Sequence, residues 1–252
     1  MVKICALWSW SNGNAYYIWT EDEAILIDCG ISYRMLNSRA EKLWLDLKKV
    51  KAVIISHSHT DHIRWLPRFH RMLPEVPIFF NGDEIANVKE EDYQIYKEVL
   101  EDVTVDDFEV GKFRIYPFLK SHDTEYPLSF RVEIEGKDIG VFTDIGKVEE
   151  DLEKHFSQCD AVFLETNYHP EMLKYGPYPI YLKNRVQETH LSNDEAFNLV
   201  KRCASPKLKI LIFSHISKDN NSYEKIMEQF HFFEQIQMSI ATREECGELF
   251  EL

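Results

Sequence analysis

The segment Lys51-Ala-Val-Ile-Ile-Ser-His-Ser-His-Thr-Asp-His62 joins an apolar run to a dense cluster of histidines. The apolar run is typical of a buried strand, and His57, His59, Asp61 and His62 follow it within six residues. On an extended or tightly turning backbone, side chains at i and i+2 point to the same side, so His57 and His59 can meet one ion. Asp61 and His62 come round the turn and can face a second ion. The segment therefore predicts a metal site at the end of a strand.

The cluster differs from the helical zinc-protease motif, in which a glutamate lies between two histidines at i and i+4. The alternative is a polar loop with incidental histidines, which is the better explanation for any single histidine. Several ligand-type side chains directly after a buried strand favour metal binding, because unpaired polar groups are costly to bury.

The composition is that of an ordinary globular protein. The chain has 252 residues, of which 44% are hydrophobic and 29% charged, and this suits a folded chain with a substantial core. No repeat, low-complexity tract or linker divides it, so we expect one domain over residues 1–252. The formal charge of -14 argues against a broad nucleic-acid footprint, although a dinuclear metal centre would concentrate positive charge in one cleft.

The cysteines and the first residues bear on the compartment. Five cysteines are widely scattered and form no C-x-x-C pair: Cys5, Cys29, Cys159, Cys203 and Cys246. An odd, dispersed set favours reduced thiols and hence a cytoplasmic protein. The start of the chain has no apolar stretch of the signal-peptide type, and no run of about eighteen apolar residues occurs, so we expect no membrane span. The sequence does not identify a protein partner.

Short apolar runs separated by turn signals predict strands through much of the chain. The first three, at 3–8, 15–19 and 24–28, are separated by Asn12-Gly13 and a second polar turn, which predicts an antiparallel meander. Further strands are expected at 51–55, 77–80, 103–105, 113–119, 128–135, 138–143, 161–167 and 209–213, and helices at 33–47, 66–72, 83–100, 149–156, 194–204 and 223–236. Residues 168–181, rich in Tyr and Pro, are expected to form an excursion.

Several expected strands end in side chains that can bind metal or transfer protons. Asp28 could hold a metal-binding histidine through a hydrogen bond or cap the next helix. His122, Asp144, Glu165 and His215 follow later strands, although His122 taken alone would be a structural or surface histidine. The recurrence predicts that one edge of a sheet stack carries the ligands.

The motif His57-x-His59-x-Asp61-His62, followed in order by His122, Asp144 and His215, resembles the metallo-β-lactamase superfamily. The resemblance implies an α/β fold, the four-layer αββα sandwich, with two sheets packed face to face, helices outside and the active site at one edge. It also implies two divalent ions, each held by three side chains and joined by a bridging carboxylate. The first ion would be bound by His57, His59 and His122, the second by Asp61, His62 and His215, and Asp144 would bridge them.

The donor set of this implied site contains nitrogen and oxygen but no sulfur. Such a set suits Zn²⁺ and also Mn²⁺. His59 stands where the diiron flavoproteins of the superfamily have a glutamate, which favours hydrolysis over redox chemistry.

Six further segments resemble the YycJ/WalJ group, which is related to ribonuclease Z and the PhnP phosphodiesterase and includes members regarded as DNA exonucleases. These segments are 8–14, 25–30, 143–146, 165–168, 190–193 and 215–221. The resemblance implies a phosphodiesterase or nuclease acting on a small phosphodiester or a nucleic-acid end. A metal-bridging hydroxide oriented by Asp61 would attack phosphorus, and His190, held by Glu165, would protonate the leaving oxygen. A helix-capping loop and a strand-end acid are the structural alternative for this pair.

The chain departs from the group in bulky residues. Trp8 and Trp10 replace small residues, Thr189 replaces a glycine, and Arg64-Trp65 follows the histidine motif. Near the cleft mouth such side chains would narrow it or provide a stacking surface, which leaves the substrate open.

Two other functions remain open from the residues. One is hydrolysis of a carboxyl ester, thioester or lactone on the same scaffold, and the other is a non-catalytic binding module. The pair of Glu165 and His190 favours phosphate, because a carbonyl substrate with a good leaving group needs no such acid. Lys183 and Arg185 are the nearest basic candidates for a flanking phosphate, with a solvated loop as the alternative.

Overall fold

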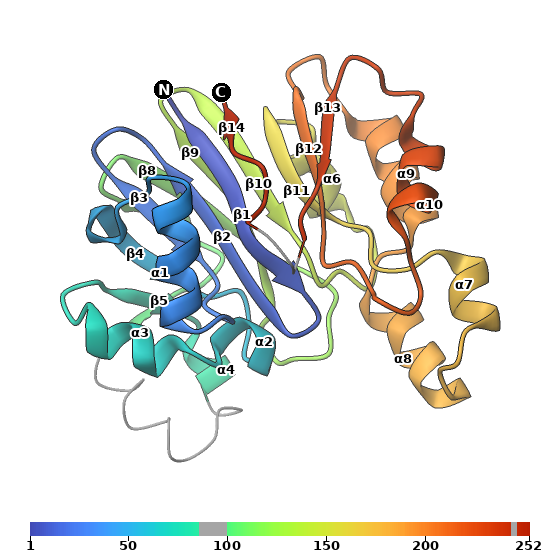
Figure 1. Ribbon diagram of the computed structural model, residues 1–252, viewed down its shortest axis with the longest axis horizontal. Coiled ribbons are helices and arrows are strands. Elements are labelled where there is room, and N and C mark those ends of the chain that lie inside the picture. The colour runs from blue at the N-terminus through green and yellow to red at the C-terminus, as the bar shows by residue number, and fades with distance from the viewer. Residues whose placement is uncertain (86–99, 243–245) are drawn as a thin grey trace.

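The computed structural model describes residues 1–85, 100–242 and 246–252, and in that part of the chain two seven-stranded sheets pack face to face (Figure 1). The first sheet contains, in spatial order, β14 (Phe250–Glu251), β1 (Lys3–Trp10), β2 (Gly13–Trp19), β3 (Ala24–Ile27), β4 (Val50–Ile54), β5 (Ile78–Phe80) and β6 (Leu100–Asp102). The second contains β13 (Gln237–Ile240), β12 (Ile210–Ser214), β11 (Ala161–Glu165), β10 (Lys137–Phe142), β9 (Leu128–Ile134), β8 (Phe113–Leu119) and β7 (Phe108–Val110).

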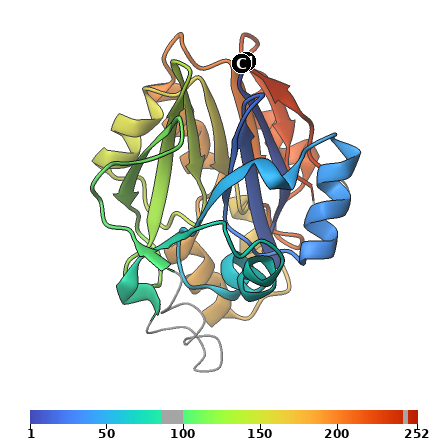
Figure 2. The ribbon, with the colours of Figure 1, turned by 90° about the vertical axis from the view of Figure 1, so that its left-hand side faces the viewer.

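Helices cover the outer faces of both sheets, and Figure 2 shows the layers edge-on. The first half of the chain contributes α1 (Tyr33–Lys42), a 3-10 turn at Leu47–Lys49, α2 (Thr60–Ile63), α3 (Leu66–Met72) and α4 (Gly82–Ile85). The second half contributes α6 (Glu150–Phe156), α9 (Asn193–Cys203) and α10 (Tyr223–Phe230) over the second sheet, and α7 (Pro170–Tyr175) and α8 (Ile180–Thr189) beyond the edge of the sheets, at the lower right of Figure 1. The αββα sandwich expected from the sequence is confirmed.

Each half begins antiparallel and continues parallel. Strands β1, β2 and β3 form the expected antiparallel meander, and β4, β5 and β6 then add in parallel. In the second sheet β7 to β10 are antiparallel, and β11, β12 and β13 continue in parallel. Because β3, β4, β10, β11 and β12 run in parallel within their sheets, the loops after them meet at one edge, near α2 and α8 in Figure 1.

The strands alternate between two apolar layers, as a period of two residues requires. In β4, Ala52 and Ile54 face the core between the sheets, whereas Val53 faces the layer under the outer helices. In β11 the inward residues include Phe163, whose ring centroid lies 5.0 Å from that of Tyr16 in the other sheet. The inner core therefore locks the two sheets together.

Several expected elements differ from the structure. The helix expected at 33–47 ends at Lys42, because Trp44 adopts a left-handed φ of 57° and is 95% exposed. The strand expected at 103–105 is irregular chain between β6 and β7, and the helix expected at 223–236 ends at Phe230. The excursion at 168–181 contains α7 and the start of α8. Most of the helix expected at 83–100 lies outside the described residues.

Two further observations concern the expected compartment. All five cysteines are free thiols. Within the described residues, no helix has the length and apolar character needed to cross a membrane.

Replacing the inter-sheet residue Phe163 with alanine is expected to lower the free energy of unfolding by about 3–5 kcal/mol, since it removes a fully buried ring. The matched control is Phe232→Ala, at a ring that is 69% exposed, which should change it by less than about 0.5 kcal/mol. Urea denaturation monitored by circular dichroism measures both. Equal losses in the two variants would contradict the assignment of the inner core.

Candidate metal centre

Three imidazoles from the two sheets converge at the edge where the parallel strands end. His57 and His59 follow β4, and His122 follows β8. The Nε2 atom of His57 lies 3.1 Å from Nδ1 of His59, and this Nδ1 lies 3.1 Å from Nε2 of His122. The structure therefore brings together the three residues expected to bind the first ion.

Hydrogen bonds on the far side of two of these rings set their tautomers. His122 donates from Nδ1 to the carbonyl oxygen of Thr189 at 2.9 Å, so its Nε2 carries a lone pair. The Ser56 hydroxyl donates its only proton to Asp28 at 3.0 Å and accepts from Nδ1 of His57 at 2.9 Å. The Nε2 atom of His57 therefore also carries a lone pair. Lone pairs aimed at one point fit a cation, since they cannot satisfy one another.

His62 begins the second group of ligand-type side chains. Its Nδ1 donates to Asp28 at 2.7 Å, and its Nε2 lies 3.3 Å from a carboxylate oxygen of Asp61 and 3.3 Å from one of Asp144. Of the two roles open for Asp28, the structure supports the partner of a histidine, because Ser32 caps α1 instead.

His215 completes the second group from the other sheet. Its Nδ1 lies 2.9 Å from Oε1 of Glu165, and its Nε2 faces Asp61 Oδ2 at 3.5 Å. This Nε2 is buried and has no hydrogen-bond partner in the described part of the chain. A buried nitrogen without a partner, aimed at a carboxylate, fits a metal ligand. Asp61, His62 and His215 thus lie together as expected.

Asp144 lies between the two groups. Its carboxylate oxygens are 3.3 Å from Nε2 of His62, 3.4 Å from Nδ1 of His215 and 3.8 Å from Nε2 of His122. The side chain is 2% exposed, and its Oδ2 makes no hydrogen bond to any described residue. A buried carboxylate with an unmatched oxygen between two clusters of imidazoles is suited to bridge two ions.

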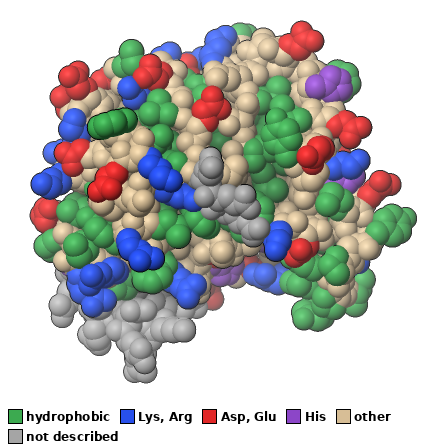
Figure 3. Space-filling model, viewed as in Figure 1, with side chains coloured by type: hydrophobic (Ala, Val, Ile, Leu, Met, Phe, Trp, Pro, Cys, Tyr) green, Lys and Arg blue, Asp and Glu red, His purple; other side chains and the backbone are tan. Residues whose placement is uncertain are grey.

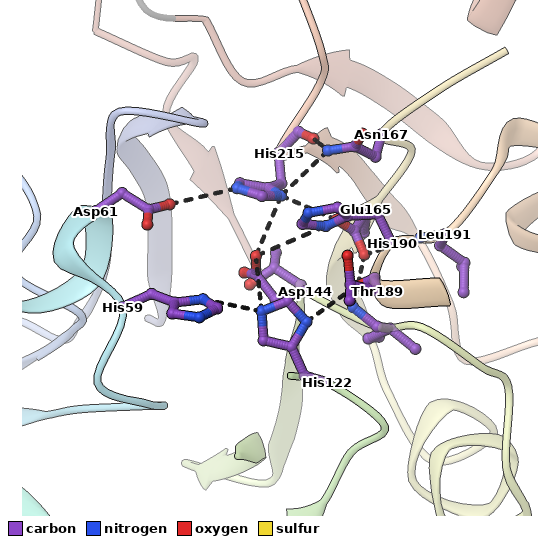
Figure 4. Close-up of polar contacts among 12 residues, drawn as sticks. His59, Asp61, His122, Asp144, Glu165, Asn167, Thr189, His190, Leu191 and His215 are labelled. Atoms are coloured by element: carbon purple, nitrogen blue, oxygen red, sulfur yellow. Dashed lines mark hydrogen bonds and ion pairs between the residues drawn. The ribbon is translucent and has the colours of Figure 1, made fainter. Parts of the chain in front are cut away.

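Glu165 and His190 lie beside this cluster (Figure 4). Nδ1 of His190 lies 2.8 Å from Oε1 of Glu165, the oxygen that also faces His215. The other oxygen of Glu165 accepts from the backbone amides of Ile145 at 2.7 Å and Leu191 at 3.1 Å. One carboxylate therefore orients both a predicted metal ligand and the predicted acid, and this double role was not expected.

Charge in the site is unevenly distributed. Burial lowers the pKa of His57 well below its usual range and that of His122 to about 3, so both rings are neutral and can donate lone pairs. Burial also opposes charge on His62, but the carboxylates of Asp28, Asp61 and Asp144 raise its pKa well above the usual value. Carboxylates therefore dominate this half of the site, which favours a cation there.

Carboxylates also raise the pKa of His215, and histidines in turn lower the pKa of Glu165. Burial would lower the pKa of His215, but Asp144, Asp61 and Glu165 raise it to about 10. Burial would raise the pKa of Glu165, whereas His190 and His215 lower it to about 2. Glu165 is therefore ionised and accepts hydrogen bonds at both oxygens.

The backbone turns sharply where these side chains leave their strands. Asp28, Asp144 and His215 have φ values of 62°, 57° and 53°. Residues other than glycine rarely adopt this left-handed region of the backbone, and such strain is concentrated at functional sites. At each turn the backbone changes direction after the strand, so that the side chain points into the cluster.

Some contributing residues are not signalled by the sequence. Asn14 donates to Asp61 at 3.1 Å, Ser9 accepts from the amide of His215 at 2.8 Å, and Asn167 donates to the carbonyl oxygen of His215 at 2.8 Å. Asn14 follows the Asn-Gly turn signal, which predicts only a turn. Ser9 and Asn167 lie in segments 8–14 and 165–168, which carry the family resemblance, but the sequence does not assign them a contact, since their partner His215 is distant in sequence.

The tryptophans differ in their surroundings. Trp8 packs under the guanidinium of Arg39 at 4.3 Å, and Trp10 packs against the core outside the second sheet. Trp65, in contrast, is 36% exposed at the start of α3. Of the three tryptophans, Trp65 follows the histidine motif most closely, directly after Arg64.

The comparisons with known proteins agree with this geometry. Residues 23–216 match the sequence model of the family described as "Beta-lactamase superfamily domain". The chain is 26% identical to the exodeoxyribonuclease YycJ of Bacillus anthracis over 86% of this chain and 83% of that protein. It is 28% identical to the exodeoxyribonuclease WalJ of Streptococcus pneumoniae over 88% and 84%. Among solved structures, the metallo-β-lactamase fold protein YhfI of Bacillus subtilis superposes with a TM-score of 0.76 at 16% identity, covering all of both chains.

Chelation of bound divalent ions with EDTA is expected to lower the melting temperature, because a ligand bound only by the folded state adds about 2.7 kcal/mol at a hundredfold excess over Kd. Asp144→Asn should reduce both the ion content, measured by mass spectrometry, and the effect of EDTA. Asp151→Asn, at an exposed carboxylate on α6, is the control. An Asp144→Asn protein with two ions per chain and an unchanged EDTA effect would contradict the central position of Asp144.

Proposed function

Since the chain belongs to the β-lactamase superfamily, we propose that it is a metal-dependent hydrolase that cleaves phosphodiester bonds. The observation that carries the proposal is the contact of Glu165 with both His190 and His215. It places a histidine that can transfer protons directly beside the candidate metal centre. The names of the relatives YycJ and WalJ, both exodeoxyribonucleases, support the same class of reaction.

We propose that two divalent ions, zinc or manganese, are held by the side chains grouped above. The ligands would be His57, His59 and His122 for the first ion, Asp61, His62 and His215 for the second, and Asp144 for both. Such ions, when bound, acidify water and neutralise charge on phosphoryl oxygens. The imidazole and carboxylate donors are compatible with either metal.

Asp61 is proposed to orient the attacking water. Its Oδ2 accepts a hydrogen bond from Asn14 at 3.1 Å and lies near His62 and His215, which fixes the carboxylate. The side chain is 21% exposed, so it lies at the boundary between the buried cluster and the solvent. A fixed carboxylate there can accept a hydrogen bond from water and direct its oxygen to phosphorus.

His190 is proposed to protonate the leaving group. Glu165 holds its Nδ1 and stabilises the imidazolium, and among the described residues its Nε2 has no hydrogen-bond partner. The ring is 12% exposed, so a bound substrate can reach it. As water adds to phosphorus, the bond to the leaving oxygen breaks, and that oxygen takes the proton from Nε2.

Asp61→Asn is expected to reduce hydrolysis of bis-p-nitrophenyl phosphate by at least about a hundredfold, since it removes a predicted ligand and the group that orients water. The rate of p-nitrophenolate release measures it, with Asp151→Asn as the matched control and circular dichroism to check the fold. Full activity in the Asp61→Asn enzyme would disprove the proposed site.

His190→Ala is expected to separate substrates by their leaving groups. Hydrolysis of an unactivated dinucleotide should fall by roughly a hundredfold or more, because an alkoxide needs a proton to depart. Release of p-nitrophenolate should fall far less. His231→Ala, at an exposed histidine after α10, is the control. Equal losses on both substrates would remove the acid role from His190.

A further inference from the structure

Basic residues are concentrated in one part of an otherwise acidic chain. Residues 33–72 contain nine Lys and Arg against three Asp and Glu, a formal charge of +6, whereas the rest of the chain carries -20. Figure 3 shows Lys and Arg side chains gathered at the lower left of the surface, over the region of α1 to α3. Lys48, Lys49 and Lys51 lie at the start of β4, away from the histidine motif, whereas Arg64, Arg68 and Arg71 follow the motif. A local positive field there attracts polyanions whatever the net charge is.

Three exposed arginines follow the histidine motif on two consecutive short helices, with Arg64 at the end of α2 and Arg68 and Arg71 in α3. Arg64, Arg68 and Arg71 are spaced by four and three residues and all are exposed. The chain turns between α2 and α3, where the amide of Trp65 donates to the carbonyl oxygen of Cys29 at 3.2 Å, and α3 opens with the bond from the amide of Arg68 to the carbonyl oxygen of Trp65 at 3.0 Å. One face of α3 buries Phe69. Arg68 and Arg71, three residues apart in α3, therefore share its exposed face.

These arginines start at the candidate metal centre. Asp61 precedes Arg64 by three residues, so both lie on the same side of α2, one turn apart.

These guanidinium groups are available to a ligand. None of the three forms an ion pair with a residue in the described ranges, although Arg71 donates from Nε to the carbonyl oxygen of Pro67 and Arg64 lies 5.9 Å from the ring of Trp65. On the side of the site formed by α8, the basic groups are already engaged. Arg185 pairs with Asp123 at 2.8 Å, and the ammonium group of Lys183 donates to a backbone carbonyl oxygen at 2.7 Å.

The loop after β8 has the opposite charge. His59 lines a cavity of about 570 Å³ whose other wall carries Asp123 and Glu125. Asp123 is already paired with Arg185, but the carboxylate of Glu125 would repel a phosphate backbone, so a strand would leave the metal centre over α2 and α3. Trp65, exposed between Arg64 and Arg68, offers a face on which a base can stack.

We propose that Arg64, Arg68 and Arg71 bind successive backbone phosphates of a nucleic-acid strand whose scissile phosphodiester lies at the metal centre. This inference rests on the proposed function and names its substrate class as a polynucleotide rather than a small phosphodiester. Contacts of this kind fix the position of the strand and carry no sequence preference.

The test measures binding of a fluorescent single-stranded DNA of about twelve phosphorothioate-linked nucleotides by anisotropy, with the metal-loaded protein, over a range of salt concentrations. Arg68→Gln with Arg71→Gln should weaken binding roughly tenfold. The slope of log K against log salt should become shallower by about 0.7 for each phosphate that the variant no longer neutralises. Arg68→Lys with Arg71→Lys, which keeps the charge, should restore most of the affinity and of the slope.

The control removes two charges from the helices over the other sheet. Lys154→Gln with Lys201→Gln, at exposed positions of α6 and α9, should leave affinity and slope close to those of the unmodified protein. An equal loss in this control, or unchanged binding in the arginine variant, overturns the proposal. Hydrolysis of bis-p-nitrophenyl phosphate by the unmodified protein tests the proposed function separately. If the protein cleaves this small ester but shows no salt-dependent DNA binding, the proposed function stands and the proposed role of the three arginines is contradicted.

Discussion

Buried carboxylates that must be matched by imidazole N–H groups organise this molecule. An isolated buried charge is very costly, and it is tolerated only when it is paired and hydrogen-bonded. Asp28 is matched by His62, and Glu165 is matched by His190 and His215. Each match uses the Nδ1 atom of a ring, so the Nε2 atoms of His62 and His215 are left facing carboxylates that favour a positive charge between them, either a proton on the ring or a cation. The matching that makes burial possible therefore also creates a cluster that can bind cations.

Neither sheet can build this cluster alone. The first sheet supplies the histidine motif after β4, and the second supplies His122, Asp144, Glu165 and His215. Hydrogen bonds join the two halves at the edge, where Ser9 accepts from the amide of His215. The inner core sets the spacing between the sheets, and with it the distances between side chains that come from opposite halves. Stability of the core and geometry of the site are thus linked properties.

Much of the fold could be predicted because its signals are local or carried by the motif. Apolar runs ending in His, Asp or Glu predict most strands of the parallel parts, and the resemblance to the metallo-β-lactamase superfamily, carried by the order of ligands, implies the sandwich. The differences have physical causes. The Pro-rich stretch predicts an excursion, yet Pro170 opens α7, because proline at the first turn of a helix loses no hydrogen bond. Trp44 ends α1 early by a left-handed turn that an apolar pattern does not signal.

Within the site, a contact is harder to predict from the sequence when its two residues lie far apart along the chain. The sequence allows two roles for Asp28, because only the folded chain brings it to His62, 34 residues away. Ser9 and Glu165 both position His215, and no short motif encodes either of these contacts.

Net charge is a poor guide to substrate in such a protein. A formal charge of -14 suggests repulsion of nucleic acid, but the field at the site depends on charges within about 10 Å, the screening length at ordinary ionic strength. Along α2 and α3, Arg64, Arg68 and Arg71 outnumber Asp61, the single acid of these two helices, and the loop with Asp123 and Glu125 lies on the other side of His59. Opposed patches of this kind guide a polyanion along one path, so the acidic remainder of the chain restricts where a strand can bind without excluding it.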